Sequence, residues 1–337
     1  MRRAALAPIF SNRLHHGGHC IGHARCRQSP LLPDDLMTET SAPDSDRLSR
    51  FLLQRAGVRG VRVHLTETWR RVLANARYPA SVEVLLGEAC AAAALFTGHA
   101  KVDGRLSVQL RASGPLRALF AECTAAGTIR GIARIAETGA ETISRDLRTL
   151  GDDAILALTI ENPAQGRDPM RYQGLVGLQS ESLSGAFEDY FRQSEQLPTR
   201  VLLAVEGDHA AGLMLQKLPG DEGDEDGWNR ASILFDTLST SELLRWPVET
   251  LLTRLFPDDD PQLLGERPLA FACSCSRERV EAMLVSLGET EARAAAVDGE
   301  ASITCEFCGR VYRFSADEIE RLLAAPVASG EASDRLQ

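Results

Sequence analysis

The most informative stretches of this 337-residue sequence are Cys273-Ser274-Cys275 and Cys305-Glu306-Phe307-Cys308-Gly309, with 29 residues between them. In an extended chain, positions i and i+2 point to the same side, so the first two cysteines can reach one ion. The second pair has the spacing of a metal knuckle, and its glycine permits the backbone to turn beneath the metal. Four thiolates around Zn²⁺, at about 2.3 Å, form a closed and non-catalytic site. The pattern therefore predicts one zinc ion per chain.

Short predicted elements around the cysteines complete a small module. Ser276 can cap a following helix, and residues 311–314 are expected to form the strand that leaves the second pair. Ser315 and Glu318 have capping-box spacing in front of a further helix. A module of about 50 residues buries little apolar surface, so zinc should supply much of its folding free energy.

The zinc-bound sulfurs are also chemically vulnerable, because the thiolate is the form that oxidants attack. A disulfide between positions i and i+2 would close a tight ring of poor geometry, so it should be strained and readily reduced. Oxidation would expel the metal and remove the main stabilisation of the module. The spacing thus offers a mechanism for a redox switch, although an inert structural zinc ribbon fits the same spacing.

Length and composition favour a globular chain with two or more domains. The 337 residues exceed the size at which one core usually stops growing, and 44% of them are hydrophobic. No run approaches about 18 consecutive apolar residues, so no membrane-spanning helix is expected. The net charge of −10 argues against a phosphate-binding surface, and the basic N-terminus lacks the apolar stretch of a secretory signal. We expect a cytoplasmic protein that binds neither membranes nor nucleic acids.

A globular domain is expected to begin near Asp46. Apolar residues with helical spacing predict helices near 82–93 and 183–191. Strands are expected at 61–65, 106–110, 129–135, 156–160, 201–205 and 212–215. The irregular mixture of hairpins and helices favours an α+β fold.

A breaker-rich segment separates this domain from the cysteines. Residues 221–227 hold five acids, which cannot bury a core. Ser239 and Glu242 form a capping box that opens a helix, and Pro247 must interrupt it. We predict short helical pieces that gain order only by docking, and we expect them to be the least stable ordered part of the chain.

The N-terminal stretch 1–36 differs from the rest, with five arginines and four histidines and no hydrophobic periodicity. It is expected to be disordered, or to lie upstream of a true start at Met37, although a His/Cys-rich tract can also bind metal. The predicted order is a disordered extension at 1–36, an α+β core domain at 37–217, a metastable helical linker at 218–270, a four-cysteine zinc-binding domain at 271–325 and a disordered tail at 326–337.

Several segments together resemble the redox-regulated 33 kDa chaperonins, the heat shock protein 33 family. The zinc motif Cys-Ser-Cys-Ser-Arg-Glu-Arg at 273–279, its long spacer and Cys-Glu-Phe-Cys-Gly at 305–309 are similar to the family's cysteine domain. Further similar segments lie at 113–116, 130–134, 173–178, 188–191 and 194–200. The resemblance covers roughly residues 48–325, whereas 1–36 and the acidic 221–227 are not part of the shared pattern.

The resemblance implies an ATP-independent holdase chaperone and no enzymatic activity. In the reduced form Cys273, Cys275, Cys305 and Cys308 would hold zinc and the protein would be inactive. Oxidation would form the disulfides Cys273–Cys275 and Cys305–Cys308, release zinc, unfold the linker and produce a homodimer. The exposed apolar surface would then bind unfolding client proteins.

Two other functions remain open from the sequence. Cys305-Glu306-Phe307-Cys308 could belong to a thiol oxidoreductase, although such motifs normally open a helix. A zinc-ribbon nucleic-acid-binding protein is disfavoured, because acids offset the arginines near the cysteines. The sequence contains no P-loop, nucleophile elbow or dinucleotide-binding fingerprint, so no catalytic or cofactor-binding residue is assigned.

The other cysteines, histidines and clustered acids are assigned no function. Cys90 and Cys123 are expected to be small buried residues. His64, His99 and His209 lack metal-ligand spacing, and the acids Glu188, Asp189 and Glu195 lack the partner groups that catalysis requires.

Overall fold

The computed structural model describes residues 10–11, 45–100, 102–163, 170–220 and 223–324. Contacts divide the chain into two compact units, one formed by residues 40–273 and the other by residues 1–39 with 274–337. The predictions for 1–36 and 326–337 therefore lie outside the described residues, apart from the two-residue strand β1 (Phe10–Ser11).

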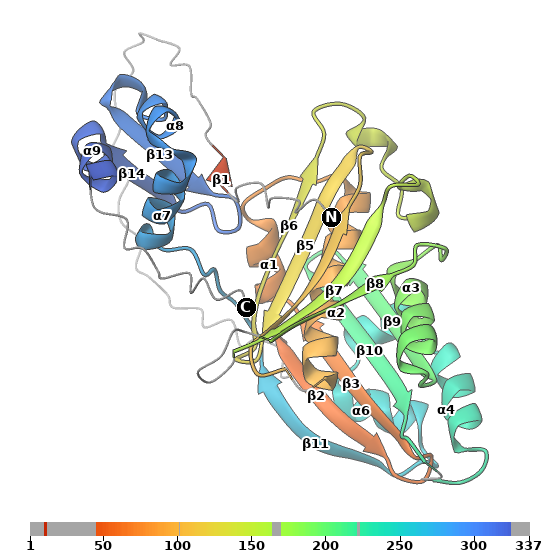
Figure 1. Cartoon of the computed structure of the whole chain (residues 1–337). Helices are drawn as coiled ribbons and strands as arrows, with labels where there is room; N and C mark the ends of the chain where they lie inside the picture. The colour runs from red at the N-terminus through yellow and green to blue at the C-terminus, as the bar shows by residue number, and fades with distance from the viewer. Residues whose placement is uncertain (1–9, 12–44, 101, 164–169, 221–222, 325–337) are drawn as a thin grey trace, which may run out of the picture. The chain divides into compact units, whose positions relative to one another are not determined.

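The larger unit contains a five-stranded and a six-stranded sheet (Figure 1). The five-stranded sheet has the order β11 (Pro261–Pro268), β2 (Arg47–Leu53), β3 (Val58–Leu65), β10 (His209–Lys217) and β9 (Thr199–Glu206), all antiparallel. The six-stranded sheet has the order β12 (Ala270–Phe271), β6 (Thr128–Ile135), β5 (Leu116–Thr124), β4 (Arg105–Arg111), β7 (Ile155–Asn162) and β8 (Met170–Val176). The α+β mixture predicted from the sequence is confirmed.

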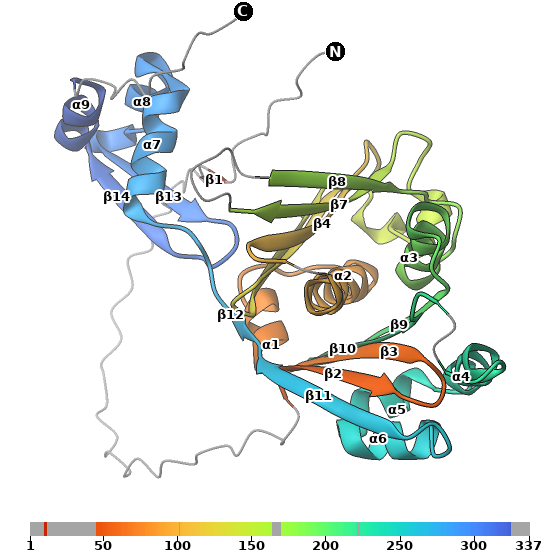
Figure 2. The ribbon, with the colours of Figure 1, turned by 60° about the horizontal axis from the view of Figure 1, so that its bottom comes forward.

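Helix α2 (Ala80–His99) lies between the two sheets, as Figure 2 shows. Among the described residues it is the one helix that is long and apolar enough to cross a membrane, although no such helix was expected from the sequence. Within the fold, 78% of the most apolar 18-residue stretch of α2 is buried. The apolar surface of α2 is therefore used by the main core, to which Val61 and Val63 of β3 also contribute.

Three short helices cover the opposite face of the five-stranded sheet (Figure 2). They are α4 (Gly227–Asp236), α5 (Thr240–Arg245) and α6 (Val248–Leu255). The capping box of Ser239 and Glu242 is present, and Pro247 separates α5 from α6 as predicted. A second hydrophobic core forms between these helices and the sheet.

The segment 218–270 also contains a strand that the sequence pattern did not predict. Its last residues form the edge strand β11, which pairs with β2. The whole segment belongs to the compact unit 40–273. In this structure the helical pieces are docked.

The remaining elements of the larger unit join its sheets. They are α1 (Glu67–Leu73), α3 (Leu183–Tyr190), the 3-10 turns η1 (Ala140–Thr142) and η2 (Leu147–Thr149), and the π-helical turn η3 (Phe191–Glu195). The predicted helices near 82–93 and 183–191 and the six predicted strands are all confirmed. Strands β2, β5 and β12 and helix α1 were missed.

The smaller unit contains a sheet of order β1, β13 (Glu300–Cys305) and β14 (Val311–Ser315). Helices α7 (Arg277–Leu287), α8 (Glu289–Ala294) and α9 (Ala316–Ala324) and the turn η4 (Val297–Gly299) accompany it. The predicted cap at Ser276 and the predicted strand at 311–314 are confirmed, whereas β13 was not predicted.

Candidate metal centre

The second cysteine pair lies in the turn that connects β13 to β14. Cys305 is the last residue of β13, and its N–H donates to the carbonyl of Arg310 at 2.9 Å. The N–H of Gly309 donates back to the carbonyl of Cys305 at 2.8 Å. Gly309 has a φ of 68°, which an L-residue with a side chain rarely adopts. The glycine thus permits the tight turn that brings Cys308 back beside Cys305.

The first cysteine pair is positioned by short elements on each side of it. The N–H of Ala272 donates to the carbonyl of Ile129 at 3.1 Å, which continues the pairing of β12 with β6. After Cys275, the side chain of Ser276 accepts a hydrogen bond from the N–H of Arg279 and caps α7. Cys273 and Cys275 therefore lie in a non-helical stretch between a strand and a helix cap.

The four predicted cysteines come together in space. Their sulfur atoms all lie within 4.8 Å of one another, and the Sγ atoms of Cys275 and Cys308 are 3.4 Å apart. A tetrahedral ion with metal–sulfur distances of about 2.3 Å would place its sulfurs about 3.8 Å apart. Cys305 is buried and the other three are partly buried. The four cysteines are therefore positioned to hold one metal ion.

Two polar side chains, Tyr312 and Arg310, lie beside the sulfurs. The hydroxyl of Tyr312 donates to Sγ of Cys275 at 3.1 Å. The pKa of Arg310 is raised, first by a hydrogen bond to Tyr312 and then by the nearby charges of Tyr312, Cys275 and Cys308. A phenol donor and a permanent cation thus lie at the edge of the cluster.

Two further cysteines in the described part of the chain contrast with this cluster. Cys90 on α2 and Cys123 on β5 are fully buried, as predicted. Burial raises the pKa of Cys123 to about 11, and burial followed by proximity to Cys123 raises the pKa of Cys90 further. Both remain protonated thiols near neutral pH and are shielded from oxidants.

A second feature is the apolar sheet face that α4–α6 cover. Side chains of the sheet that belong to this core are Phe51, Leu53, Val58, Ala204, Ala211, Leu213 and Leu215. The helices and the turns that follow them contribute a matching set, namely Ala231, Phe235, Leu238, Leu243, Leu244, Val248, Leu251, Leu252, Leu255 and Phe256. Because every one of these side chains is buried, loss of the helices would expose a continuous apolar face.

Polar contacts fix the helices on this face. Arg230 of α4 donates to Asp224 at 3.0 Å and also pairs with Asp259, whose side chain is fully buried. The pKa of Arg230 is raised, mainly by its hydrogen bond to Asp259. Arg62 of β3 is buried and donates to the carbonyl of Trp246 at 2.6 Å, at the break that Pro247 creates between α5 and α6. The contacts of Arg230 with Asp259 and of Arg62 with Trp246 were not anticipated, because the partners are far apart in sequence.

The acids considered at the sequence level have separate structural roles. Glu188 accepts from the N–H of Val201 at 2.8 Å, and Asp189 accepts from the Ser180 hydroxyl at 2.7 Å. Glu195 is exposed. The structure does not bring them together as a catalytic group.

The three histidines lie on different elements. His64 stacks on His209 with ring centroids 5.5 Å apart, whereas His99 lies at the end of α2. Among the described residues, the four cysteines are the one group of at least three metal-ligating side chains that meets at a common point.

Comparisons with known proteins agree with this arrangement. The sequence model of the family described as "Hsp33 protein" matches residues 46–315. A 33 kDa chaperonin of Ectopseudomonas mendocina is 42% identical over 300 residues, which cover 86% of this chain and 99% of that protein. A 33 kDa chaperonin of Pseudomonas putida is 43% identical over 291 residues, covering 84% and 95% respectively.

A solved structure has the same fold. The crystal structure of the 33 kDa chaperonin (heat shock protein 33 homolog) of Thermotoga maritima aligns with a TM-score of 0.66 at 21% sequence identity. The alignment covers 82% of this chain and 97% of that chain.

Proposed function

This chain belongs to the Hsp33 family, and we propose that it is an ATP-independent holdase chaperone controlled by the oxidation of its four clustered cysteines. The observation that carries the proposal is the apolar sheet face beneath α4–α6, within the same chain as a four-sulfur cluster. A covered apolar surface and an oxidisable cluster are the two parts that a redox-controlled holdase requires.

Zinc is the metal that we assign to the reduced form, with one ion per chain. Four sulfur donors are typical of structural zinc sites and of iron–sulfur centres. Zinc, when bound, would keep the sulfurs of Cys273, Cys275, Cys305 and Cys308 as thiolates and supply stability that the small unit lacks. Metal analysis of the reduced protein, purified without added metal, tests the assignment, and iron in place of zinc would contradict it.

Oxidation would pair the cysteines that are adjacent in sequence, Cys273 with Cys275 and Cys305 with Cys308. For each pair, one peroxide molecule removes two electrons, so that an S–S bond forms and the O–O bond breaks. Two protons from the thiols, or from solvent if thiolates react, complete two water molecules. Since Sγ of Cys275 also lies 3.4 Å from Sγ of Cys308, peptide mapping of the oxidised protein must distinguish the two pairings.

The linker helices are suited to release because they are short. They contain 10, 6 and 8 residues, whereas an isolated helix needs about 12–15 to be even marginally stable in water. Their order therefore depends on docking to the sheet, and undocking and unfolding become one event. We propose that loss of the folded cysteine unit promotes this event.

Release would expose the sheet face that includes Phe51, Leu213 and Leu215. We assign this face to unfolding client proteins, because a contiguous apolar surface binds exposed apolar segments with little sequence preference. We also propose that the oxidised protein is a homodimer and that it acts in the cytoplasm.

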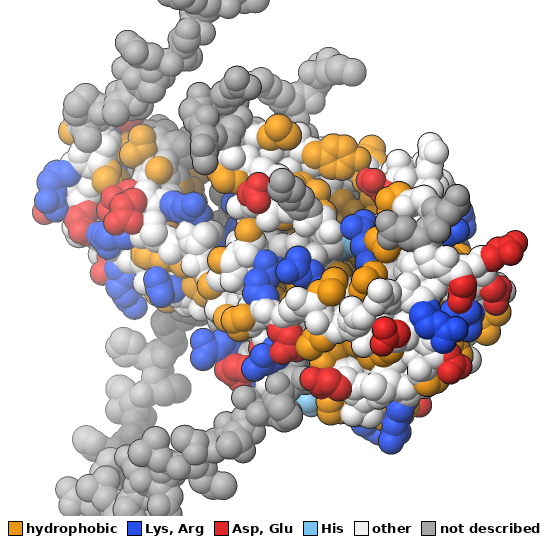
Figure 3. All heavy atoms as spheres, turned by 90° about the horizontal axis from the view of Figure 1, so that it is seen from below, with side chains coloured by type: hydrophobic (Ala, Val, Ile, Leu, Met, Phe, Trp, Pro, Cys, Tyr) orange, Lys and Arg blue, Asp and Glu red, His pale blue; other side chains and the backbone are white. Residues whose placement is uncertain are grey.

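The two alternative functions receive no support from the structure. Cys305 and Cys308 lie in a β-hairpin turn and do not open a helix, unlike the cysteines expected in a thiol oxidoreductase. Two of the arginines near the cluster are paired with acids, Arg277 with Glu318 and Arg313 with Glu300. On the face that Figure 3 draws, blue and red side chains are interleaved, without the single basic field that nucleic acids require.

Light scattering by a heat-unfolding client protein tests the proposal. The full chain is added either reduced and zinc-loaded, or after peroxide treatment at mild heat. We expect suppression of aggregation only by the oxidised sample, and reversal by dithiothreitol.

A variant with Cys90→Ala and Cys123→Ala is the matched control, since it removes two buried thiols and leaves the cluster intact. It should respond to oxidation like the natural chain. Equal suppression by reduced and oxidised samples would eliminate the switch, and no suppression by either would contradict the chaperone assignment.

A further inference from the structure

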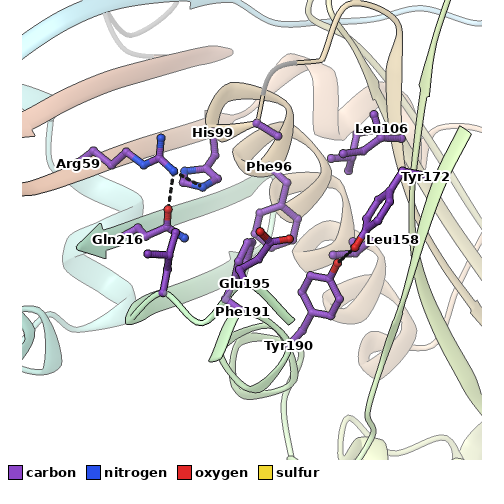
Figure 4. A pocket seen from close by; sticks show the side chains of 13 residues that line it. Arg59, Phe96, His99, Leu106, Leu158, Tyr172, Tyr190, Phe191, Glu195 and Gln216 are labelled. Carbon is purple, nitrogen blue, oxygen red and sulfur yellow. Dashed lines mark hydrogen bonds between the residues drawn. The ribbon is translucent and has the colours of Figure 1, made fainter. Parts of the chain in front are cut away.

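The larger unit contains a cavity that neither the cysteine cluster nor the covered sheet face uses. Its volume is about 280 Å³. Most of its wall is apolar and comes from both sheets, the end of α2 and the turn η3, with Phe96, Leu158 and Phe191 among the lining side chains. Figure 4 draws Arg59, His99 and Gln216 together on one side and the two tyrosines on the other. The cavity is therefore an apolar chamber with a polar group at each end.

A positive charge marks one end of the cavity. Arg59 of β3 shares the inner sheet face with Val61 and Val63, and its cross-strand partner on β10 is Gln216. Its Nη2 donates to Oε1 of Gln216 at 2.5 Å and to Nε2 of His99 at 3.1 Å. A guanidinium can only donate, so Nε2 of His99 must accept. Burial, followed by the charge of Arg59, lowers the pKa of His99 to about 4, so this ring is neutral near pH 7.

The charge of Arg59 has no anionic partner. Across the part of the chain that the structure describes, no carboxylate forms an ion pair with Arg59, and both of its hydrogen-bond acceptors are neutral. Its Nε atom is buried and has no hydrogen-bond partner within the same residues. A partly buried cation without a counter-charge is costly, and an anion that enters the cavity would relieve this cost.

The other end of the cavity is formed by two phenols. The hydroxyls of Tyr172 on β8 and Tyr190 on α3 are 3.3 Å apart. The ring of Tyr190 packs over Gly174, where an added Cβ atom would lie 2.3 Å from the Tyr190 hydroxyl. The close approach therefore requires glycine at this position and fixes the phenol at the cavity wall.

We propose that this cavity binds an amphipathic carboxylate of on the order of ten non-hydrogen atoms, such as a medium-chain fatty acid, with the carboxylate on Arg59. The size follows from the cavity volume, at about 30 Å³ for each water-sized group. The apolar chain lies along Phe96 and Leu158 and ends near the tyrosines. This site is separate from the chaperone function proposed above.

The carboxylate of Glu195 provides a second test of whether charge controls binding in the cavity. Glu195 also lines the cavity, and it is exposed to solvent. Its charge opposes a carboxylate, but water and salt screen it more strongly than they screen a buried group. Neutralising Glu195 should therefore strengthen binding, whereas neutralising Arg59 should weaken it.

Isothermal titration calorimetry with the reduced, zinc-loaded full chain tests the site, with octanoate as the probe. We expect saturable binding of one octanoate per chain. Octanol, which lacks the charge, should bind at least about tenfold more weakly, in line with the strength of a charge-assisted hydrogen bond. Acetate, which lacks the chain, should also bind at least about tenfold more weakly, because it buries little apolar surface.

Variants assign the two ends of the ligand. Arg59→Gln should weaken octanoate binding by at least about tenfold and leave octanol unchanged, while Glu195→Gln should strengthen octanoate binding a few-fold. Arg111→Gln, at an exposed arginine on β4 outside the cavity, should change neither. Leu197→Trp narrows the cavity without touching Arg59 and should weaken both ligands, which keeps the test valid if Arg59→Gln does not fold.

Three outcomes would overturn the proposal. Octanoate that does not saturate would show that no site exists. Octanol binding as tightly as octanoate would remove the role of the charge. Unchanged octanoate affinity in a folded Arg59→Gln variant would also show that the charge of Arg59 plays no role. Since binding is measured without oxidation or client, none of these results bears on the chaperone assay.

Discussion

Leu251→Ala should convert the reduced protein into a partly active chaperone. Leu251 lies on α6, has no exposed surface and belongs to the core between the linker helices and the sheet. Truncating a buried leucine to alanine costs about 2–5 kcal/mol. Each 1.4 kcal/mol is about a factor of ten, so the docking equilibrium should shift roughly thirtyfold to several thousandfold toward release.

Two measurements on the reduced, zinc-loaded variant check this expectation. Hydrogen exchange should accelerate across residues 227–256, whereas the amides of α2 should remain protected. Light scattering should show that the reduced variant suppresses client aggregation without any oxidant, and peroxide should add further suppression.

Matched variants separate linker release from general destabilisation. Thr253→Ala changes an exposed position on the same helix and should leave exchange and aggregation unchanged. Leu85→Ala removes a buried side chain from the core around α2, so it should lower the melting temperature without opening the linker.

A Leu251→Ala variant that accelerates exchange in the linker and yet does not suppress aggregation would refute the role assigned to the covered face. The covered face would then not be the surface that holds clients. If exchange does not accelerate at all, contacts other than apolar packing must hold the linker in place.

Three further predictions follow from the same geometry. Arg230→Met removes the partner of the buried Asp259 carboxylate, so it should destabilise the docked linker by about 1–3 kcal/mol and raise its susceptibility to limited proteolysis. Chelation under reducing conditions should unfold residues 274–324 and leave the strand protection of residues 47–217 unchanged, as hydrogen exchange can show. Burial lowers the pKa of His99 to about 4, below that of an unfolded histidine. His99 therefore adds stability above about pH 6.5, and this stability is lost as the pH falls toward 4. His99→Gln should flatten the pH dependence of the melting temperature in this range.

Sequence patterns identified the elements whose side chains face one core. The strand at 106–110 was recognised because apolar and polar residues alternate along it, and the helix that begins near Val82 because apolar residues recur at helical spacing. The structure buries α2 on nearly all sides, which the sequence pattern did not predict. The cysteine cluster was recognised for a different reason, since four donors of one chemical type leave few alternatives. Neither inference required knowledge of how distant segments pack.

The elements that were missed lack such a pattern. Strand β2 contributes Leu48 to one core and Phe51 and Leu53 to the other, so its apolar residues do not alternate. Strand β11 is mostly exposed and begins and ends with proline, because backbone pairing with β2 forms it and side-chain burial contributes little. The uncompensated charge of Arg59 was equally invisible, since it depends on which groups from other strands surround it.

Strand β3 shows how the sheet can lose one cover and remain folded. Val58 packs against the linker helices, whereas Val61 and Val63 pack toward α2. Release of α4–α6 would remove only the first set of contacts, and an antiparallel sheet with one solvated face is an ordinary structure. The main core around α2 would keep the exposed face in shape, so the opened protein would present a preformed apolar surface. Protection of the α2 and β10 amides in the oxidised protein should therefore match that in the reduced protein, and a loss of protection there would mean that opening also unfolds the main core.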